Sequence, residues 1–140
     1  MRVSKLRNLI AAALICLSLL VFGGSANAAP LPTCSVTATV SSQLTGFILF
    51  EGYRGIGRGI LNCDQTVSAS TVSVTVEVSP GGADSNAKPC TNSSSCETDA
   101  DAATARAPVN CTFVEAAGQA VGALGFPGGT ATDCNTTDKP

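Results

Sequence analysis

The sequence predicts a mainly β fold, a small antiparallel β-sandwich or barrel-like domain with disulfide-tethered loops. Two observations favour this fold class. Between Thr71 and Pro80 four valines alternate with Ser, Thr and Glu, which is the period of a half-buried strand. The chain also has an even set of six cysteines after residue 28, which is typical of a small exported domain.

The first 28 residues are predicted to be a secretory signal peptide. Arg2, Lys5 and Arg7 precede an apolar run from Leu9 to Phe22, and a small-residue A-x-A triplet ends at Ala28. The apolar run is shorter than the roughly 20 residues that span a bilayer, so cleavage after Ala28 is favoured over an uncleaved anchor. We therefore expect no membrane span after cleavage and a product that is secreted or periplasmic, with the cell surface as a further location.

Residues 29–140 are predicted to form a single secreted β-rich domain of 112 residues. Five basic residues against ten acidic residues give this part a net charge of −5, so we expect no nucleic-acid partner. It has no tryptophan and one tyrosine, and most of its apolar residues are small. Because burial of small side chains yields little apolar area per residue, we expect covalent cross-links to add stability.

The six cysteines of this domain are predicted to supply those cross-links. The absence of histidine and of any C-x2-C pair argues against a metal site, and we assign no metal ligand and no cofactor. The sequence leaves every pairing of the six cysteines open. Our working hypothesis pairs neighbours in sequence, which close the smallest loops. The pairs are Cys34 with Cys63, Cys90 with Cys96, and Cys111 with Cys134.

Residues 29–80 are the best-defined β unit. Apolar residues alternate with Ser and Thr from Cys34 to Val40, which predicts a first strand. The apolar run Phe47 to Phe50 predicts a short buried strand. Near Ser70 and Thr71 the apolar positions change parity, which indicates a β-bulge or a tight reversal, with the bulge favoured.

A glycine-rich segment runs from Gly52 to Cys63. It does not match a dinucleotide-binding fingerprint, because Ile60 stands where the third glycine should be and no βαβ pattern follows. Its alternating glycines indicate a strand that bulges or passes close under a neighbouring strand.

The same segment contains Arg54 and Arg58, the clustered cations of residues 29–140. Solvated side chains are the simplest interpretation of the two arginines. As a functional hypothesis, Tyr53, Arg54 and Arg58 form our candidate binding surface.

Residues 81–108 are predicted to be a polar loop region, because they are rich in Ser, Asn, Asp, Ala and Thr. Glu97, Asp99 and Asp101 alternate as in a calcium-binding loop, but the glycine and glutamate positions of an EF-hand are not matched. We therefore expect a solvated acidic loop. Asp101 to Ala107 are predicted to form two turns of helix before Pro108.

Residues 109–134 are predicted to be a second β or mixed part. Val109 to Val114 is predicted to be a strand. For residues 113–125 a helix and two short strands remain equal alternatives, because the apolar spacing is helical but three glycines oppose a helix. Residues 135–140 are predicted to be a frayed tail.

No catalytic residue is assigned from the sequence. The chain lacks histidine and the G-x-S-x-G and S-x-x-K nucleophile motifs. Glu51, Glu77 and Glu115 are the carboxylates that we nominate for glycoside hydrolysis, if two of them lie at a suitable separation. We predict that the protein is not an enzyme.

Three motifs resemble the first half of the spore coat protein U and Csu-type pilin domains. They are the CSV opening at Cys34, the run GRGILNC from Gly57 to Cys63, and the alternating strand that ends in glycine at Gly82. The resemblance implies an incomplete immunoglobulin-like β-sandwich, a disulfide between Cys34 and Cys63, and assembly by donated strands.

These observations predict an exported, disulfide-stabilised, non-enzymatic binding or structural protein of the cell envelope or extracellular space. One alternative is a pilin-like or coat subunit that assembles by strand donation. A second alternative is a small secreted hydrolase that uses carboxylates. The expected partners of the protein are other proteins or further copies of the chain.

Overall fold

The fold is described from a computed structural model, which describes residues 28–46, 51–126 and 128–136. The chain divides into two units, residues 1–30 and 31–140, and every strand described here lies in the second. The described residues contain strands and turns and no helix, so the prediction of a mainly β chain is confirmed. The predicted signal peptide up to residue 27, the Phe47 to Phe50 strand and residues 137–140 of the tail lie outside the described residues. Residues 135 and 136, which were predicted to belong to a frayed tail, form the end of the last strand instead.

Six strands in the described residues form one curled sheet, in which most neighbours are antiparallel and one pair is parallel. The strand order is β5-β1-β2-β4-β6, and β3 pairs with the other edge of β2. The strands are β1 (Thr33–Thr45), β2 (Gly52–Ser79), β3 (Ala83–Ala105), β4 (Val109–Ala120), β5 (Leu124–Gly125) and β6 (Gly129–Thr136).

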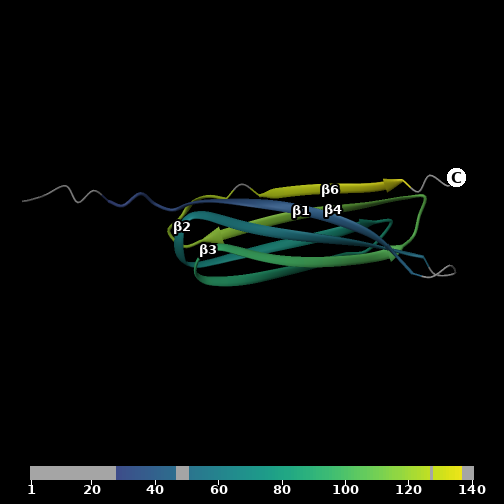
Figure 1. Ribbon diagram of the computed structural model, residues 1–140, viewed down its shortest axis with the longest axis horizontal. Coiled ribbons are helices and arrows are strands. Elements are labelled where there is room, and N and C mark those ends of the chain that lie inside the picture. The colour runs from purple at the N-terminus through teal and green to yellow at the C-terminus, as the bar shows by residue number, and fades with distance from the viewer. Residues whose placement is uncertain (1–27, 47–50, 127, 137–140) are drawn as a thin grey trace, which may run out of the picture. The chain divides into compact units, whose positions relative to one another are not determined.

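The 28-residue strand β2 organises the sheet. Its first half, up to Cys63, pairs with β1, and its second half, from Ser70, pairs with β4. Strand β3 runs antiparallel to both halves. Figure 1 shows β2 turning back at one end of the unit, so that its two halves lie one over the other. The valine run therefore lies in the second half of a longer strand, which ends at Ser79.

The irregularity of β2 lies earlier than the sequence predicted. The register with β3 shifts between Asn62 and Val67, and not at Ser70 or Thr71. The chain continues as a strand through residues 70 and 71, which excludes a tight reversal there. The buried positions nevertheless change parity between Val67 and Ser70, opposite the left-handed residue Asn92 (φ 48°). The bend of β2 therefore spans both irregularities.

The prediction that residues 81–108 form a polar loop region is wrong, because residues 83–105 form strand β3. The predicted helix over Asp101 to Ala107 is also wrong, since β3 continues to Ala105. Strand β3 is defined by backbone pairing with β2, which requires no apolar side chains. Its first residues are exposed on both faces, and alternate residues become buried only from Cys96 onward.

The second β or mixed part is a β structure. Val109 to Val114 lies in strand β4, as predicted, and β4 continues to Ala120. Leu124 and Gly125 form the short strand β5, so the two-strand alternative for residues 113–125 is correct and the helix is excluded. Pairing of β4 with both β2 and β6 outweighs the helical spacing of its apolar residues.

The inner faces of the two halves of β2 are complementary. A Cβ atom placed on Gly57 would lie 2.5 Å from Cγ2 of Val76 and 2.8 Å from Cγ1 of Val114. One placed on Gly59 would lie 3.1 Å from Cβ of Ala116. The glycine segment therefore passes close under a neighbouring layer, as one of the two interpretations of its pattern predicted.

Two buried clusters form the core, and each takes side chains from both halves of β2. The first cluster contains Cys34, Val36, Leu61, Val67, Val72, Cys96 and Ala116. The second contains Tyr53, Val74, Val76, Val78, Ala100, Ala102 and Val114. Most of these side chains are small, so the core depends on close approach of the strands.

Candidate functional site

The structure separates the three residues of the predicted binding surface. Tyr53 is fully buried, and its hydroxyl lies 2.9 Å from Oγ1 of Thr112 on β4. Arg54 and Arg58 point to the opposite, exposed face of β2, because successive side chains of a strand alternate between faces. Tyr53 is therefore a core residue and not part of a surface, and that part of the prediction is wrong.

The two arginines are held by acidic residues of β3. Arg54 Nε donates a hydrogen bond to Asp101 (2.8 Å), and Arg58 Nε donates one to Asp99 (2.8 Å), with Glu97 at 4.0 Å. The hydrogen bond to Asp99, then the charges of Asp99 and Glu97, raise the pKa of Arg58 above its ordinary value. The alternating acids of residues 97–101 thus form ion pairs on a strand, and they do not form a loop.

A shallow groove of about 330 Å³ runs along these ion pairs. Besides the two arginines and their aspartates, it is lined by Thr39 and Ser41 of β1 and by Ile56 of β2. Because the guanidinium groups are already paired with carboxylates, this face does not present free positive charge to an anion.

Two of the three nominated carboxylates lie near each other. Glu77 pairs with Phe113, and Glu115 pairs with Thr75, so the two glutamates are diagonal neighbours on adjacent strands. They line a groove of about 320 Å³ beside the exposed ring of Phe113. Glu51 forms an ion pair with Arg106 instead. The hydrolase hypothesis therefore keeps Glu77 and Glu115 as its carboxylates.

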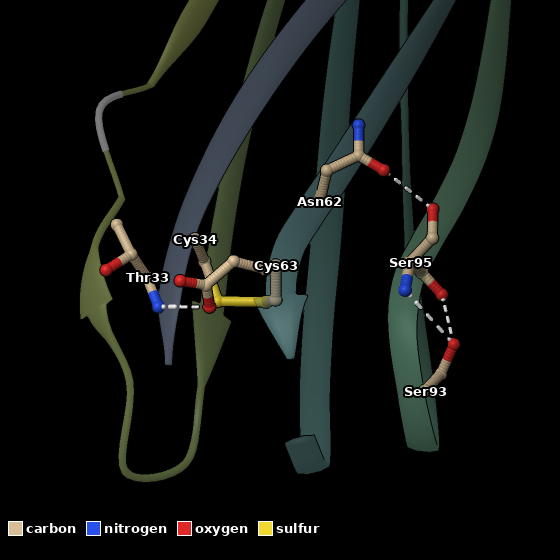
Figure 2. Close-up of a disulfide and its surroundings, with 7 residues drawn as sticks. Thr33, Cys34, Asn62, Cys63, Ser93 and Ser95 are labelled. Atoms are coloured by element: carbon tan, nitrogen blue, oxygen red, sulfur yellow. Dashed lines mark hydrogen bonds between the residues drawn. A yellow bond between two sulfur atoms is a disulfide. The ribbon is translucent and has the colours of Figure 1, made fainter. Parts of the chain in front are cut away.

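The six cysteines form three disulfides, in the pairing that closes the smallest loops. Cys34–Cys63 joins β1 to β2, and Figure 2 shows it beside a hydrogen bond from the Thr33 N–H to the Asp64 carboxylate (2.8 Å). Nearby, Ser95 donates a hydrogen bond to the side-chain oxygen of Asn62 (2.9 Å), which ties β3 to the end of this half of β2. Disulfides of this kind indicate an oxidising compartment.

The outer edge of β1 is the backbone feature that the sequence did not reveal. Strand β1 pairs with β2 along one edge, but on its other edge it pairs only with the two residues of β5, at Thr33 and Cys34. The start of β6 lies against β1 at Thr37 and Ala38, because a Cβ atom on Gly129 would lie 2.6 Å from the Ala38 nitrogen. From Thr39 to Thr45, no strand of the described residues pairs with this edge.

Further properties of the described residues concern metals and membranes. In residues 28–46, 51–126 and 128–136 no three His, Cys, Asp or Glu side chains come together as ligands of a metal ion. Within the same ranges, no helix has the length and apolarity that crossing a membrane requires.

No family model matches the chain, and no curated protein matches it. Among solved structures, the chain is similar to the putative ApaA protein from Bordetella pertussis, with 8% identity and a TM-score of 0.45 over 79% of this chain and 100% of that one. A protein from Archaeoglobus fulgidus matches at 8% identity and a TM-score of 0.39, over 73% of this chain and 98% of that one. A structural-genomics target named SoR45 matches at 7% identity and a TM-score of 0.40, over 74% and 87%. With TM-scores below 0.5, these similarities carry no inference about function.

Proposed function

We propose that this chain is an exported, disulfide-stabilised, non-enzymatic binding or structural protein of the cell envelope or extracellular space, and that it acts through the outer edge of β1. The observation that supports this proposal is the unpaired edge from Thr39 to Thr45. The N–H and C=O groups of such an edge form a template on which an extended segment of another chain can pair.

The composition of β1 distinguishes it from the outer strands β3 and β6. None of the 13 residues of β1 is charged or a proline. In contrast, β3 carries Asp84, Lys88 and Pro89 in its exposed half, and β6 carries Asp133. Charged residues and proline on an edge strand oppose pairing with other chains. The edge of β1 lacks both, which favours a role in pairing.

The edge of β1 also lies beside the core. Val40 of β1 and Ala131 of β6 are half-buried and pack against the second buried cluster. Leu44, near the end of β1, is 53% exposed. A segment that pairs with β1 would therefore gain backbone hydrogen bonds and contact with apolar side chains.

A pilin-like or coat subunit that assembles by strand donation is the second candidate function. The same open edge favours it, since a donated strand from a second copy would occupy that edge. This candidate function implies an incomplete, immunoglobulin-like β-sandwich. Its two layers would be the regions around the two halves of β2. The face-to-face packing of Gly57 against Val76 supports it.

The test uses residues 29–140 with the disulfides formed. Size-exclusion chromatography over a range of concentrations, with and without a synthetic peptide of residues 69–78, reports self-association and strand binding. We expect one of these two to occur, and we expect the variant Thr39→Lys/Gln43→Lys, at two exposed positions of the open edge, to abolish it while the circular dichroism spectrum stays unchanged. Thr75→Lys is the matched control, because Thr75 is exposed on the central part of β2 between β3 and β4.

Two results would contradict the proposal. One is a protein that stays monomeric at every concentration, binds no strand peptide, and protects the β1 amides from hydrogen exchange. The other is an equal loss of association in the Thr75→Lys control, which would place the contact on the sheet face and not on its edge.

A further inference from the structure

The disulfide between Cys111 and Cys134 differs from the other two in its exposure. Cys134 is exposed and Cys111 is half-buried. The Cys34–Cys63 and Cys90–Cys96 bonds each have one deeply buried member, since Cys34 and Cys96 are both 2% exposed. Attack on a disulfide requires access to a sulfur atom, so the three bonds differ in their expected reactivity.

The surroundings of this disulfide leave it open to a thiolate. The two cysteines are directly opposite each other on β4 and β6, on the outer face of the sheet. Their neighbours on that face are Phe113 and Thr132, and Ser79 of β2 pairs with Cys111 on the other side. These three side chains are uncharged, and the nearest carboxylate on this face of β2 is Glu77, which pairs with Phe113 and is diagonal to Cys111.

The same disulfide holds the last strand of the sheet. Strand β6 ends the strand order and pairs with β4 alone. Its half-buried Ala131 packs against the second buried cluster, and its other inward side chain in this stretch, Asp133, is charged. Strand β6 therefore has little apolar burial of its own, and it is attached by its backbone pairing with β4 at eight positions and by this covalent bond.

We propose that Cys111–Cys134 is a thiol–disulfide exchange site, at which an exported dithiol reductant opens the bond and releases β6 from β4. One thiolate of the reductant attacks Sγ of Cys134, forms a mixed disulfide and expels Cys111 as a thiolate. The second thiol of the reductant then displaces Cys134. The protein disulfide gains two electrons and two protons, and the dithiol is oxidised to a disulfide.

Release of β6 would change the sheet in a defined way. The outer edge of β4, from Val109 to Ala116, loses its partner, and the core side chain Val114 loses its cover on that side. Strands β1 to β3 keep their pairing and two disulfides. The inference is independent of the proposed function, because the edge of β1 is open with the Cys111–Cys134 bond intact.

The experiment exposes folded residues 29–140 to limiting dithiothreitol, blocks new thiols with N-ethylmaleimide and maps the labelled peptides by mass spectrometry. We expect Cys111 and Cys134 to be labelled about tenfold faster than the other four cysteines, since access limits exchange. Hydrogen exchange on the same samples should show loss of protection in β6 and in the facing edge of β4, while the Val72 to Val78 amides of β2 stay protected.

Two variants serve as controls. In Cys111→Ser/Cys134→Ser, the β6 amides should already be weakly protected from hydrogen exchange without reductant. Addition of reductant should not change their protection further. Cys90→Ser/Cys96→Ser should keep the response of β6 to reductant. Three results would each overturn the proposal: faster labelling of another pair, unchanged protection of β6 after reduction, or reduction of all three bonds in one global unfolding step. The measurement on the wild-type protein decides even if a variant fails to fold.

Discussion

The two halves of β2 face each other and have opposite inner surfaces. In the first half, three successive inward positions are glycine, at residues 55, 57 and 59. In the second half, four successive inward positions are valine, from Val72 to Val78. A glycine has no Cβ atom, so the valine side chains approach the backbone of the glycine half closely, and a Cβ atom on Gly57 would lie 2.5 Å from Cγ2 of Val76. The core is thus filled because the two halves of β2 lie close together, and not because its side chains are bulky.

The outer surfaces of the two halves also differ. The glycine half presents Arg54 and Arg58, each paired with acidic residues of β3. The valine half presents Thr75 and Glu77, which form no ion pair in the described part of the chain. Stability should therefore depend strongly on the inner surfaces and the cross-links, and weakly on the charged outer surface.

Removal of the disulfide that joins the glycine half to β1 should cause the largest loss in the free energy of unfolding. The Cys34–Cys63 bond closes a loop with a sequence separation of 29, and Cys90–Cys96 closes one of 6. The chain-entropy relation gives losses of about 3.6 kcal/mol for Cys34→Ala/Cys63→Ala and about 2.2 kcal/mol for Cys90→Ala/Cys96→Ala. Urea unfolding of both variants measures the two losses, and a larger loss for the Cys90 variant would contradict the ranking.

Substitution of the inward glycines by alanine should cause the next largest loss in the free energy of unfolding. Gly57→Ala puts a methyl group 2.5 Å from Val76, which must move, and we expect a loss of about 1–3 kcal/mol in the free energy of unfolding. Gly59→Ala meets Ala116 at 3.1 Å and should cost less. Gly81→Ala is the matched control, because no atom lies within 4 Å of its added Cβ.

Urea unfolding of these three variants tests the close approach of the two halves. The expected order of destabilisation is Gly57→Ala, then Gly59→Ala, then Gly81→Ala with almost no change. Equal effects at positions 57 and 81 would show that the two halves do not pack against each other through the glycine surface.

Much of this comparison is visible in the sequence, because period-2 alternation reports which face is buried. The strands containing Val36, Val74 and Val114 follow from that alternation. The position of Tyr53 could have been predicted in the same way. It shares the parity of the inward glycines, whereas Arg54 and Arg58 have the other parity. Grouping the three residues on one surface ignored this signal.

Strand β3 and the open edge could not be predicted from the sequence. The first half of β3 carries polar side chains on both faces, and its pairing with β2 is made by backbone groups. Its polar side chains also serve the structure, since Asn86 donates a hydrogen bond to the Asp99 carbonyl (3.0 Å). Which edge of β1 is unpaired depends on the order of strands far apart in sequence, and alternation contains no information about that order.

The smallest effect is expected on the outer surface of the glycine half. Arg54→Gln removes the ion pair with Asp101, but both side chains are nearly half exposed, so water solvates the remaining carboxylate. An exposed ion pair contributes about 0–1 kcal/mol, and we expect a loss within that range that shrinks in concentrated NaCl. Urea unfolding of Arg54→Gln, Asp101→Asn and the double variant, at low and high salt, gives the interaction energy between the two side chains. A loss as large as that of Gly57→Ala, unaffected by salt, would mean that the arginine stem packs as part of the core, and the contrast between inner and outer surfaces would fail.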